Sequence, residues 1–148
     1  MSGRGEAALA EARAWIGTPY VHQASCRGAG TDCLGLIRGI WRALYGAEPC
    51  AVPAYTAAWA EVSREEGLMR AADIWLVPKP LDQAALGDVL LFRMREGGIA
   101  KHLGLQSAIA PLGRFIHAYS GHSVTESALS APWARRVAAR FSFPERVL

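Results

Sequence analysis

The chain has 148 residues, of which 51% are hydrophobic and 20% are charged, and its formal net charge at pH 7 is +3. This size and balance predict one globular domain, here spanning residues 1–148. The chain has no long run of lysine and arginine and no apolar stretch long enough to span a bilayer. We therefore expect that the protein does not bind nucleic acid and does not insert into a membrane. The segment WARR (133–136), with Arg140 beyond it, is the only basic patch of the sequence and is interpreted as a solvated face in preference to an anion-binding surface.

The N-terminus and the cysteines indicate where the chain is made. The first 15 residues lack the apolar core of a secretory signal peptide. The three cysteines, Cys26, Cys33 and Cys50, cannot all pair within one chain, and their spacing is not that of a disulfide scaffold. We therefore expect synthesis and folding in a reducing cytoplasm, wherever the protein acts later.

The first predicted element is a helix over residues 6–16, which Gly17 ends and Pro19 follows. A turn-rich loop is expected over residues 20–30. This loop leads into the most informative segment of the chain, GTDCLGLIRGIW, which runs from residue 30 to residue 41.

A second helix is predicted to start after Thr31 or Asp32, either of which can cap it, and to end at Gly46. Its apolar residues recur at helical spacing and form one face: Cys33, Leu36, Ile37, Ile40, Trp41 and Leu44. Gly35 and Gly39 lie inside it, and interior glycines cost about 1 kcal/mol each relative to alanine. That cost indicates that this helix packs closely on a neighbouring element.

The second half of the chain changes from helical to alternating periodicity. Residues 57–64 and 65–75 are expected to be helical, and residues 77–80 (VPKP) to form a linker-like turn. After Gly87 a period of two predicts five strands, over residues 88–94, 100–107, 114–119, 122–127 and 136–143. Helices followed by a strand meander indicate an α+β fold with an antiparallel sheet of about five strands.

Cys33 is the first candidate for a functional side chain. It occupies the first turn of the second helix, where the helix dipole favours the thiolate form. A cysteine nucleophile needs a base that accepts the proton of its thiol. A lone cysteine on a helix face is more often a small core residue, so the assignment depends on the histidines.

His102 and His117 lie in two successive predicted strands. If the connecting loop forms a hairpin that pairs Ser107 with Arg114, then Gly104 lies opposite His117, and His102 becomes the diagonal neighbour of His117 on the same face. Such neighbours are about 7–8 Å apart, within reach of two imidazole rings. One ring could therefore orient the other and hold its tautomer, as a carboxylate does in related triads.

Five short segments resemble, in order, the motifs of the NlpC-type cell-wall peptidases, a branch of the papain-like cysteine peptidases. They are WIGTPY (15–20), DCLGL (32–36), LGDVLLF (86–92), KHLGL (101–105) and FIHA (115–118). The resemblance implies a papain-like fold in which N-terminal helices pack on an antiparallel sheet.

The same resemblance implies roles for individual residues. Cys33 would be the nucleophile, His102 the general base and then acid, and His117 the residue that orients His102. Tyr20 and Asp32 would line the site. The implied reaction is hydrolysis of an amide in the peptidoglycan stem peptide, typically D-γ-glutamyl to diaminopimelate, through an acyl-enzyme and without a metal or other cofactor. The backbone N–H of Cys33 is a natural oxyanion donor, because helix N-termini present unpaired donors.

Leu34 and residues 21–24 depart from the family pattern, which usually has serine after the cysteine and two glycines after the tyrosine. Without that serine, the subsite for the free amine of a stem peptide has an apolar wall, so Leu34 is a candidate substrate-binding residue. We expect an enzyme that accepts intact, glycan-linked peptidoglycan. The short form without an export signal resembles peptidases of phage and gene-transfer-particle tails. This implies carriage in a phage-like particle and contacts with tail proteins.

Three other interpretations stay open. A zinc site could use His22, Cys26, Cys33 and a later histidine, although the spacing of the two cysteines differs from that of the usual short ligand pair. The chain could be a catalytically silent structural tail protein, or it could transfer acyl groups with the same triad. Cys26 and Cys50 are interpreted as passive thiols and His122 as a turn residue.

Overall fold

Helices occupy the first half of the chain, and strands occupy most of the second half. The computed structural model describes residues 3–49, 67–95, 98 and 100–145. Its helices are α1 (Gly3–Trp15), α2 (Cys33–Tyr45), α4 (Gly67–Trp75) and the short α5 (Ala131–Ala134). Its strands are β1 (Ser25–Cys26), β2 (Gly30–Thr31), β3 (Val77–Lys79), β4 (Val89–Arg93), β5 (Ala100–Ala108), β6 (Arg114–Tyr119), β7 (His122–Ala128) and β8 (Val137–Ser142). This order confirms the predicted α+β class.

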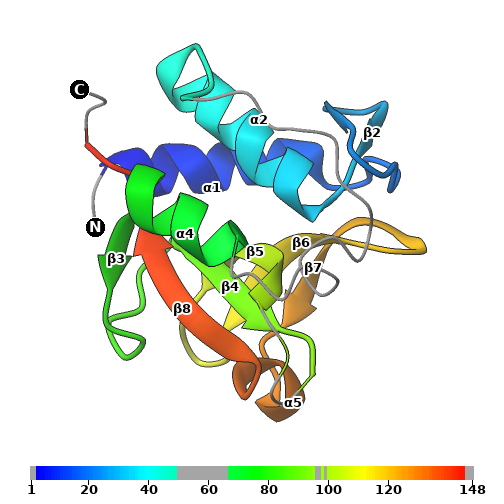
Figure 1. Ribbon diagram of the computed structural model, residues 1–148. Coiled ribbons are helices and arrows are strands. Elements are labelled where there is room, and N and C mark those ends of the chain that lie inside the picture. Colours follow the sequence, from blue (N-terminus) through cyan, green and yellow to red (C-terminus); the bar gives the residue numbers. More distant parts are fainter. Residues whose placement is uncertain (1–2, 50–66, 96–97, 99, 146–148) are drawn as a thin grey trace.

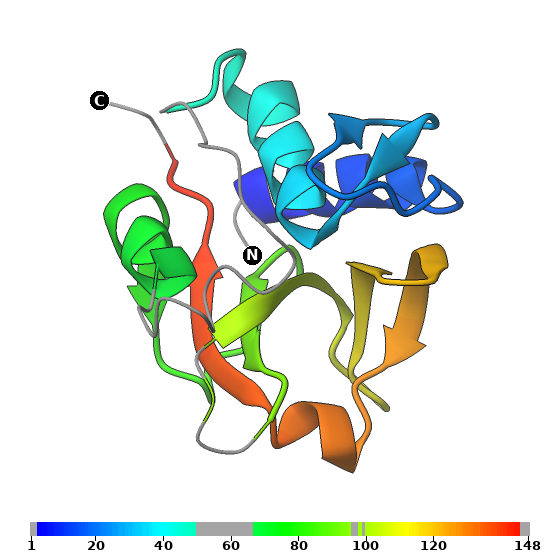
Figure 2. The same ribbon diagram turned by 45° about the vertical axis from the view of Figure 1, so that its right-hand side comes forward.

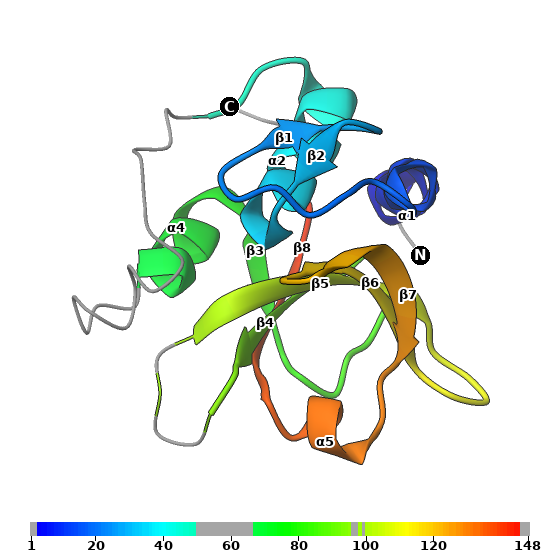
Figure 3. The ribbon, with the colours of Figure 1, turned by 90° about the vertical axis from the view of Figure 1, so that its right-hand side faces the viewer.

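The central layer is a six-stranded antiparallel sheet with the order β3-β8-β4-β5-β6-β7, while β1 and β2 pair with each other in a separate hairpin. Helices α1 and α2 lie across one face of this sheet (Figure 1). In the view turned by 90°, the β1–β2 hairpin lies on the same side, and α5 lies on the opposite side (Figure 3). Both faces of the central strands are therefore covered by other parts of the chain.

Two apolar clusters hold these layers together. Buried residues of the larger cluster, between the helices and the sheet, include Ala8, Ala12, Trp15, Leu36, Ile40, Leu103, Leu105 and Ile116. The smaller cluster lies on the other face and consists of Leu90, Phe92 and Phe115, with Trp133 among the residues packed against them. Leu68 and Ala72 of α4 belong to the larger cluster, so α4 packs on the same face as α2 (Figure 2).

Helix α2 begins and packs as its sequence predicts. Asp32 is the N-cap, and its Oδ1 accepts a hydrogen bond from the backbone N–H of Gly35 at 2.7 Å. A Cβ atom placed on Gly39 would lie 2.1 Å from Cζ2 of Trp15, and one on Gly35 would lie 2.0 Å from the carbonyl oxygen of Ala24. The two interior glycines therefore allow α1 and the loop before β1 to approach α2 closely.

The segment predicted as a linker-like turn is instead strand β3. Val77 pairs with Ser142 of β8, and Pro78 pairs with Phe141. The prediction was wrong because the two prolines of VPKP indicated a turn, whereas an edge strand tolerates proline on its unpaired side. The sheet consequently has six strands instead of about five. The helix predicted over residues 65–75 is α4, and the one predicted over 57–64 lies outside the described residues.

Arg140 is not part of a solvated face, which corrects the interpretation of the basic segment. It is 6% exposed, and its Nη1 donates to Asp88 Oδ2 at 2.8 Å and to Gln106 Oε1 at 2.9 Å. Lys79 Nζ also contacts Asp88, at 3.1 Å from Oδ1. These bonds join β3, β5 and β8 at the start of β4. In the part of the chain that the structure describes, no helix is long and apolar enough to cross a membrane.

Candidate active site

The thiol of Cys33 lies against strand β5, on the backbone that flanks His102. Cys33 is the first residue of α2, directly after the N-cap Asp32. Its Sγ donates to the carbonyl oxygen of Lys101 at 3.8 Å, and the backbone N–H of Leu103 donates to the sulfur. The start of α2 therefore brings the thiol next to the strand that carries His102.

Burial raises the pKa of the Cys33 thiol to about 11. The carboxylate of Asp32 also raises it, whereas the backbone N–H groups of Leu103, Leu34 and Cys33 itself lower it. The expectation that the helix start favours a thiolate is therefore wrong for the resting site. The donors of the first turn do act on the sulfur, but removal of the thiol from water has the larger effect.

The two histidines meet as the strand register predicts. Their rings form a hydrogen bond, with His102 Nε2 2.9 Å from His117 Nδ1. The predicted closing pair is not formed, because Arg114 pairs with Ala108 and the register shifts between Gln106 and Ala108.

Beyond that shift the register agrees with the prediction. Leu105 pairs with Ile116, so the next residue along β5, Gly104, faces His117 across the strands. His102 is then the diagonal neighbour of His117, which explains why the two rings reach each other.

Both imidazoles are held neutral at physiological pH. Burial, followed by the proximity of His117, lowers the pKa of His102 to about 3. Burial, followed by the proximity of His122, lowers the pKa of His117 to about 4. The bond to His117 uses Nε2 of His102, so Nδ1 is the ring nitrogen of His102 that this bond does not involve.

Trp133 covers the histidine pair on the sheet face opposite α2. Its ring centroid lies 5.7 Å from that of His102 and 5.2 Å from that of His117. Tyr119 also contacts both rings, at 5.9 and 5.8 Å. The interpretation of residues 133–136 as a solvated face is therefore wrong for Trp133. The sequence offers one signal, since a proline at the second position of α5, Pro132, is typical of the start of a helix.

Ser127 is a further polar contact that the sequence analysis missed. Its Oγ lies 2.9 Å from Nε2 of His117. Thr125 pairs with His117 and Ser127 pairs with Phe115, so Ser127 is a diagonal neighbour of His117 on the far side of β6. The hairpin register of β6 and β7 could have identified this residue.

Tyr20 and Asp32 lie beside the thiol. Burial raises the pKa of the Tyr20 phenol, and the nearby Cys33 and Asp32 raise it further. The Asp32 carboxylate is buried, and its Oδ2 accepts the N–H of Gln23 at 2.7 Å while its Oδ1 caps α2. Gln23 has a φ of 65°, a left-handed conformation that favours glycine, in the segment where the resembled family usually has glycines. The structure thus gives Asp32 a capping role, and its place in the lining of a substrate site stays a prediction.

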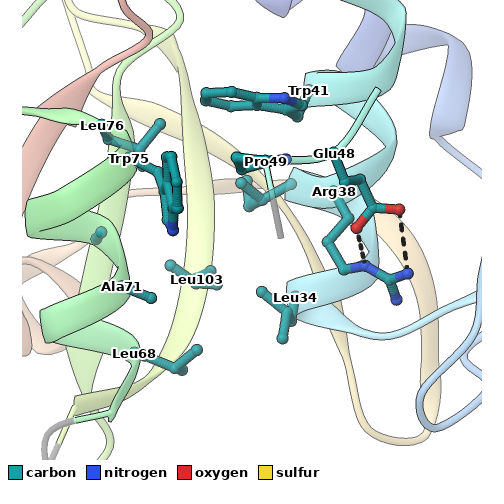
Figure 4. A pocket seen from close by; sticks show the side chains of 12 residues that line it. Leu34, Arg38, Trp41, Glu48, Pro49, Leu68, Ala71, Trp75, Leu76 and Leu103 are labelled. Carbon is teal, nitrogen blue, oxygen red and sulfur yellow. Dashed lines mark hydrogen bonds and ion pairs between the residues drawn. The ribbon is translucent and has the colours of Figure 1, made fainter. Parts of the chain in front are cut away.

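Leu34 points into a pocket of about 110 Å³ between α2 and α4 (Figure 4). The other lining residues are Ile37, Arg38, Trp41, Glu48, Pro49, Leu68, Ala71, Ala72, Trp75, Leu76 and Leu103. Arg38 and Glu48 form an ion pair, with Nε 2.6 Å from Oε1. Since Leu34 follows Cys33 and Leu103 follows His102, this apolar pocket flanks the thiol and the strand beside it.

The remaining candidates lie apart from this cluster or at its edge. Cys26 is exposed on β1, and Cys50 lies outside the described residues. His122 is the first residue of β7 and stacks on Tyr119 with centroids 5.3 Å apart. Within the described ranges, no three His, Cys, Asp or Glu side chains are grouped so that they could hold a metal ion.

Comparisons with known proteins relate this arrangement to solved structures. No family model matches the sequence, and no curated protein matches it. The NlpC/p60 domain of the peptidoglycan hydrolase SagA matches with a TM-score of 0.63 and 24% identity, over 94% of this chain and 98% of that one. A lipoprotein-like protein of the NLP/P60 family from Staphylococcus aureus gives a TM-score of 0.65 and 17% identity, over 99% of this chain and 43% of that one.

A third match comes from a eukaryote. NlpC1 from Trichomonas vaginalis gives a TM-score of 0.62 and 18% identity, over 97% of this chain and 45% of that one. The chain thus spans nearly the whole SagA domain but less than half of the other two chains. These matches confirm the predicted papain-like architecture, and the chain has the NlpC/p60 fold.

Proposed function

We propose that this protein is a cysteine peptidase that hydrolyses an amide bond in peptidoglycan stem peptides. The proposal rests on the position of the Cys33 thiol at the start of α2. The sulfur contacts backbone groups of Lys101 and Leu103 in β5. The residue between these two, His102, is hydrogen-bonded through its ring to His117. Two further facts support it: the fold is that of NlpC/p60 domains, and one of the matched domains comes from a peptidoglycan hydrolase.

The proposed reaction has two steps on these groups. The sulfur of Cys33 attacks the amide carbon while its proton moves to Nδ1 of His102, which then protonates the leaving amine. Water attacks the resulting thioester while His102 takes a proton from that water. The carbon–sulfur bond then breaks, His102 returns the proton to the departing sulfur, and the acid product is released. Because the resting thiol and imidazole are both neutral, attack and proton transfer have to occur together.

Donors for the developing oxyanion are available at the same place. The backbone N–H groups of Cys33 and Leu34 lie in the first turn of α2 and already act on the sulfur. We assign the N–H of Cys33 to the carbonyl oxygen of the bound amide, where negative charge develops next to the sulfur.

The bond that we propose is the one from D-γ-glutamyl to diaminopimelate. The test is mass spectrometry of purified peptidoglycan after incubation with the protein, with Cys33→Ala as the inactive variant and Cys26→Ala as the matched control. Fragments ending in a free γ-glutamyl carboxylate are expected from the natural protein and from Cys26→Ala. Fragments whose glutamyl carbonyl has gained an added amine would indicate acyl transfer. An unchanged digest would indicate a silent structural protein.

Leu34 leads to a prediction about substrate length. Its apolar side chain offers no hydrogen bond to an ammonium group, and a hydrogen bond to a charged group contributes about 1.5–3 kcal/mol. We expect the natural protein to cleave intact sacculi at a rate close to that for free tetrapeptide, and Leu34→Ser to shift this ratio toward the free peptide by about ten- to a hundred-fold. A strong preference for free peptide that Leu34→Ser leaves unchanged would remove Leu34 from this role. Carriage in a phage-like tail stays a prediction from the sequence resemblance.

A further inference from the structure

Ser127 ends a line of hydrogen bonds that starts at His102, whose neighbours Lys101 and Leu103 contact the Cys33 thiol through their backbone groups. His102 Nε2 lies 2.9 Å from His117 Nδ1, and His117 Nε2 lies 2.9 Å from Ser127 Oγ. The two histidines are buried, at 6% and 2% exposure, and the bond between them is buried, whereas the bond to the half-buried Ser127 is part-buried. Each shared proton therefore has to belong to one of the two groups that the bond joins.

Two arrangements of protons satisfy both bonds. In the first, His102 Nε2–H donates to His117 Nδ1, and His117 Nε2–H donates to Ser127 Oγ. In the second, the serine hydroxyl donates to His117 Nε2, and His117 Nδ1–H donates to His102 Nε2. Neutral imidazole carries a single proton, so the second arrangement places the proton of His102 on Nδ1.

Only the first arrangement permits the proposed reaction. It leaves Nδ1 of His102 as a lone pair that can take the proton of Cys33, whereas the second occupies that position. When His102 has taken this proton, its Nε2–H still donates to His117, and the Nε2–H of His117 still donates to Ser127. The same line of bonds therefore serves the neutral and the protonated states of the base.

The hydroxyl of Ser127 affects the two arrangements unequally. Without it, the first arrangement leaves the Nε2–H of His117 as a buried donor with no acceptor, which protein interiors rarely tolerate. The second arrangement leaves only an unfilled lone pair on that nitrogen, which is better tolerated. Loss of the hydroxyl should therefore shift the histidine pair toward the arrangement that cannot accept a proton.

We propose that Ser127 is a positioning residue that selects the tautomer of the histidine pair in which Nδ1 of His102 is free to accept a proton. This inference rests on the proposed function for its catalytic consequence, but the tautomer itself is a property of the free protein. Among the described residues, Tyr119 from β6 contacts both rings and His122 from β7 lies near His117, while the Cys33 thiol from α2 contacts the backbone of Lys101 beside His102. The indole of Trp133 from α5 covers the pair and carries no charge.

The direct test is nuclear magnetic resonance of the imidazole nitrogens in protein labelled with ¹⁵N, without substrate and near neutral pH. In the natural protein both His102 and His117 are expected to carry their proton on Nε2. Ser127→Ala is expected to move a measurable fraction of both rings to the Nδ1–H form, and Ser127→Thr, which keeps the hydroxyl, is expected to restore Nε2–H. An Nδ1–H proton on His102 in the natural protein would overturn the proposal, whether or not peptidoglycan is cleaved.

The kinetic test uses the same variants. Ser127→Ala is expected to lower kcat by about three- to ten-fold with little change in KM, the size expected for one neutral hydrogen bond, and Ser127→Thr is expected to recover most of the loss. Ser123 lies exposed on the same strand, so Ser123→Ala is the matched control and should keep both constants. If Ser127→Ala remained folded, with kcat unchanged and with His102 and His117 still protonated on Nε2, Ser127 would have only a structural role. If the natural protein lacked hydrolase activity while the tautomers behaved as stated, the proposed function alone would fail.

Discussion

Burial decides the protonation states of the side chains around the candidate nucleophile. The pKa of Cys33 is raised to about 11, and those of His102 and His117 are lowered to about 3 and about 4. Each shift has desolvation as its largest cause and favours the uncharged form. The resting site therefore holds a neutral thiol and neutral rings, so in the proposed reaction the nucleophile forms only as the proton moves to His102.

Alkylation of the cysteines tests this neutral resting state. At neutral pH we expect iodoacetamide to modify the exposed Cys26 faster than Cys33, whose rate should rise about ten-fold per pH unit between pH 7 and 9 because only the thiolate reacts. Peptide mass spectrometry after timed labelling measures both rates, and Cys26→Ser removes the competing thiol. A rate for Cys33 that is already constant below pH 8 would indicate a preformed thiolate.

Substitution of the histidines separates the base from the residue that orients it. His102→Ala should lower kcat by about 10²- to 10⁴-fold, because it removes the proposed general base. If His117 only orients His102, His117→Asn and His117→Gln should keep more activity than His117→Ala, since an amide can still accept the Nε2–H. The measurement is kcat on purified peptidoglycan for the four variants. Equal and mild effects of the two alanine substitutions would contradict the assignment of these roles.

At the scale of elements, the position of the thiol depends on how closely α2 approaches its neighbours. The ring of Trp15 in α1 lies over Gly39, and the carbonyl of Ala24 lies over Gly35. The Oδ1 of Asp32 caps the helix at the same end. Because α2 is a rigid unit that starts at Cys33, displacement of its middle also moves the sulfur relative to β5.

Substitution of Gly39 by alanine tests this packing. Alanine improves helix propensity by about 1 kcal/mol, but its Cβ would lie 2.1 Å from Trp15, and overpacking of this kind costs about 1–3 kcal/mol or more. We expect a net decrease in the free energy of unfolding, measured by urea denaturation. The matched control is Gly3→Ala in α1, where nothing lies within 4 Å of the added atom and the change should stay within about 0.5 kcal/mol. Trp15→Phe replaces the indole with a smaller ring. The double variant Gly39→Ala/Trp15→Phe should therefore recover part of the free energy of unfolding that the overpacking removes.

At the scale of the molecule, the histidine pair lies inside the fold instead of on an open surface. Helices α1 and α2 cover one face of the sheet, and α5 lies on the other side (Figure 3). The ring of Trp133 in α5 packs against the rings of His102 and His117. The Asp88–Arg140 pair and its partners join the strands at the start of β4. Folding therefore has to bury two imidazoles in their neutral form, which links stability to pH.

This linkage has a definite direction. Histidines in the unfolded chain bind protons with a pKa near 6.5, whereas folded His102 and His117 bind them only near pH 3 and pH 4. The unfolded state thus takes up more protons, so stability is complete above pH 6.5 and falls as the pH decreases toward 4, by up to about 1.4 kcal/mol per pH unit for each histidine. Urea denaturation between pH 7 and 5 measures the slope. The double variant His102→Gln/His117→Gln should flatten it.

Local patterns in the sequence were sufficient for α2 and for the histidine pair. The apolar spacing and the Asp32 cap define where the helix starts, and therefore where Cys33 lies on it. Alternation along two consecutive strands was enough to place His102 and His117 on one face and in reach of each other. Both inferences concern residues that are near in sequence or joined by one hairpin, where the chain geometry alone restricts the answer.

The tertiary structure alone decided which environment these residues have. The sequence indicated a thiolate at Cys33, but contact with β5 removes the sulfur from water and raises its pKa. The prolines of residues 77–80 indicated a turn, but β8 offers an edge on which that segment pairs. Trp133 and Arg140 read as surface residues, yet one covers the histidine pair and the other is bonded to Asp88. In each case the partner that determines the environment is distant in sequence. Burial by such a partner, or pairing with it, does not change the local spacing of apolar and polar residues, so the sequence pattern cannot indicate it.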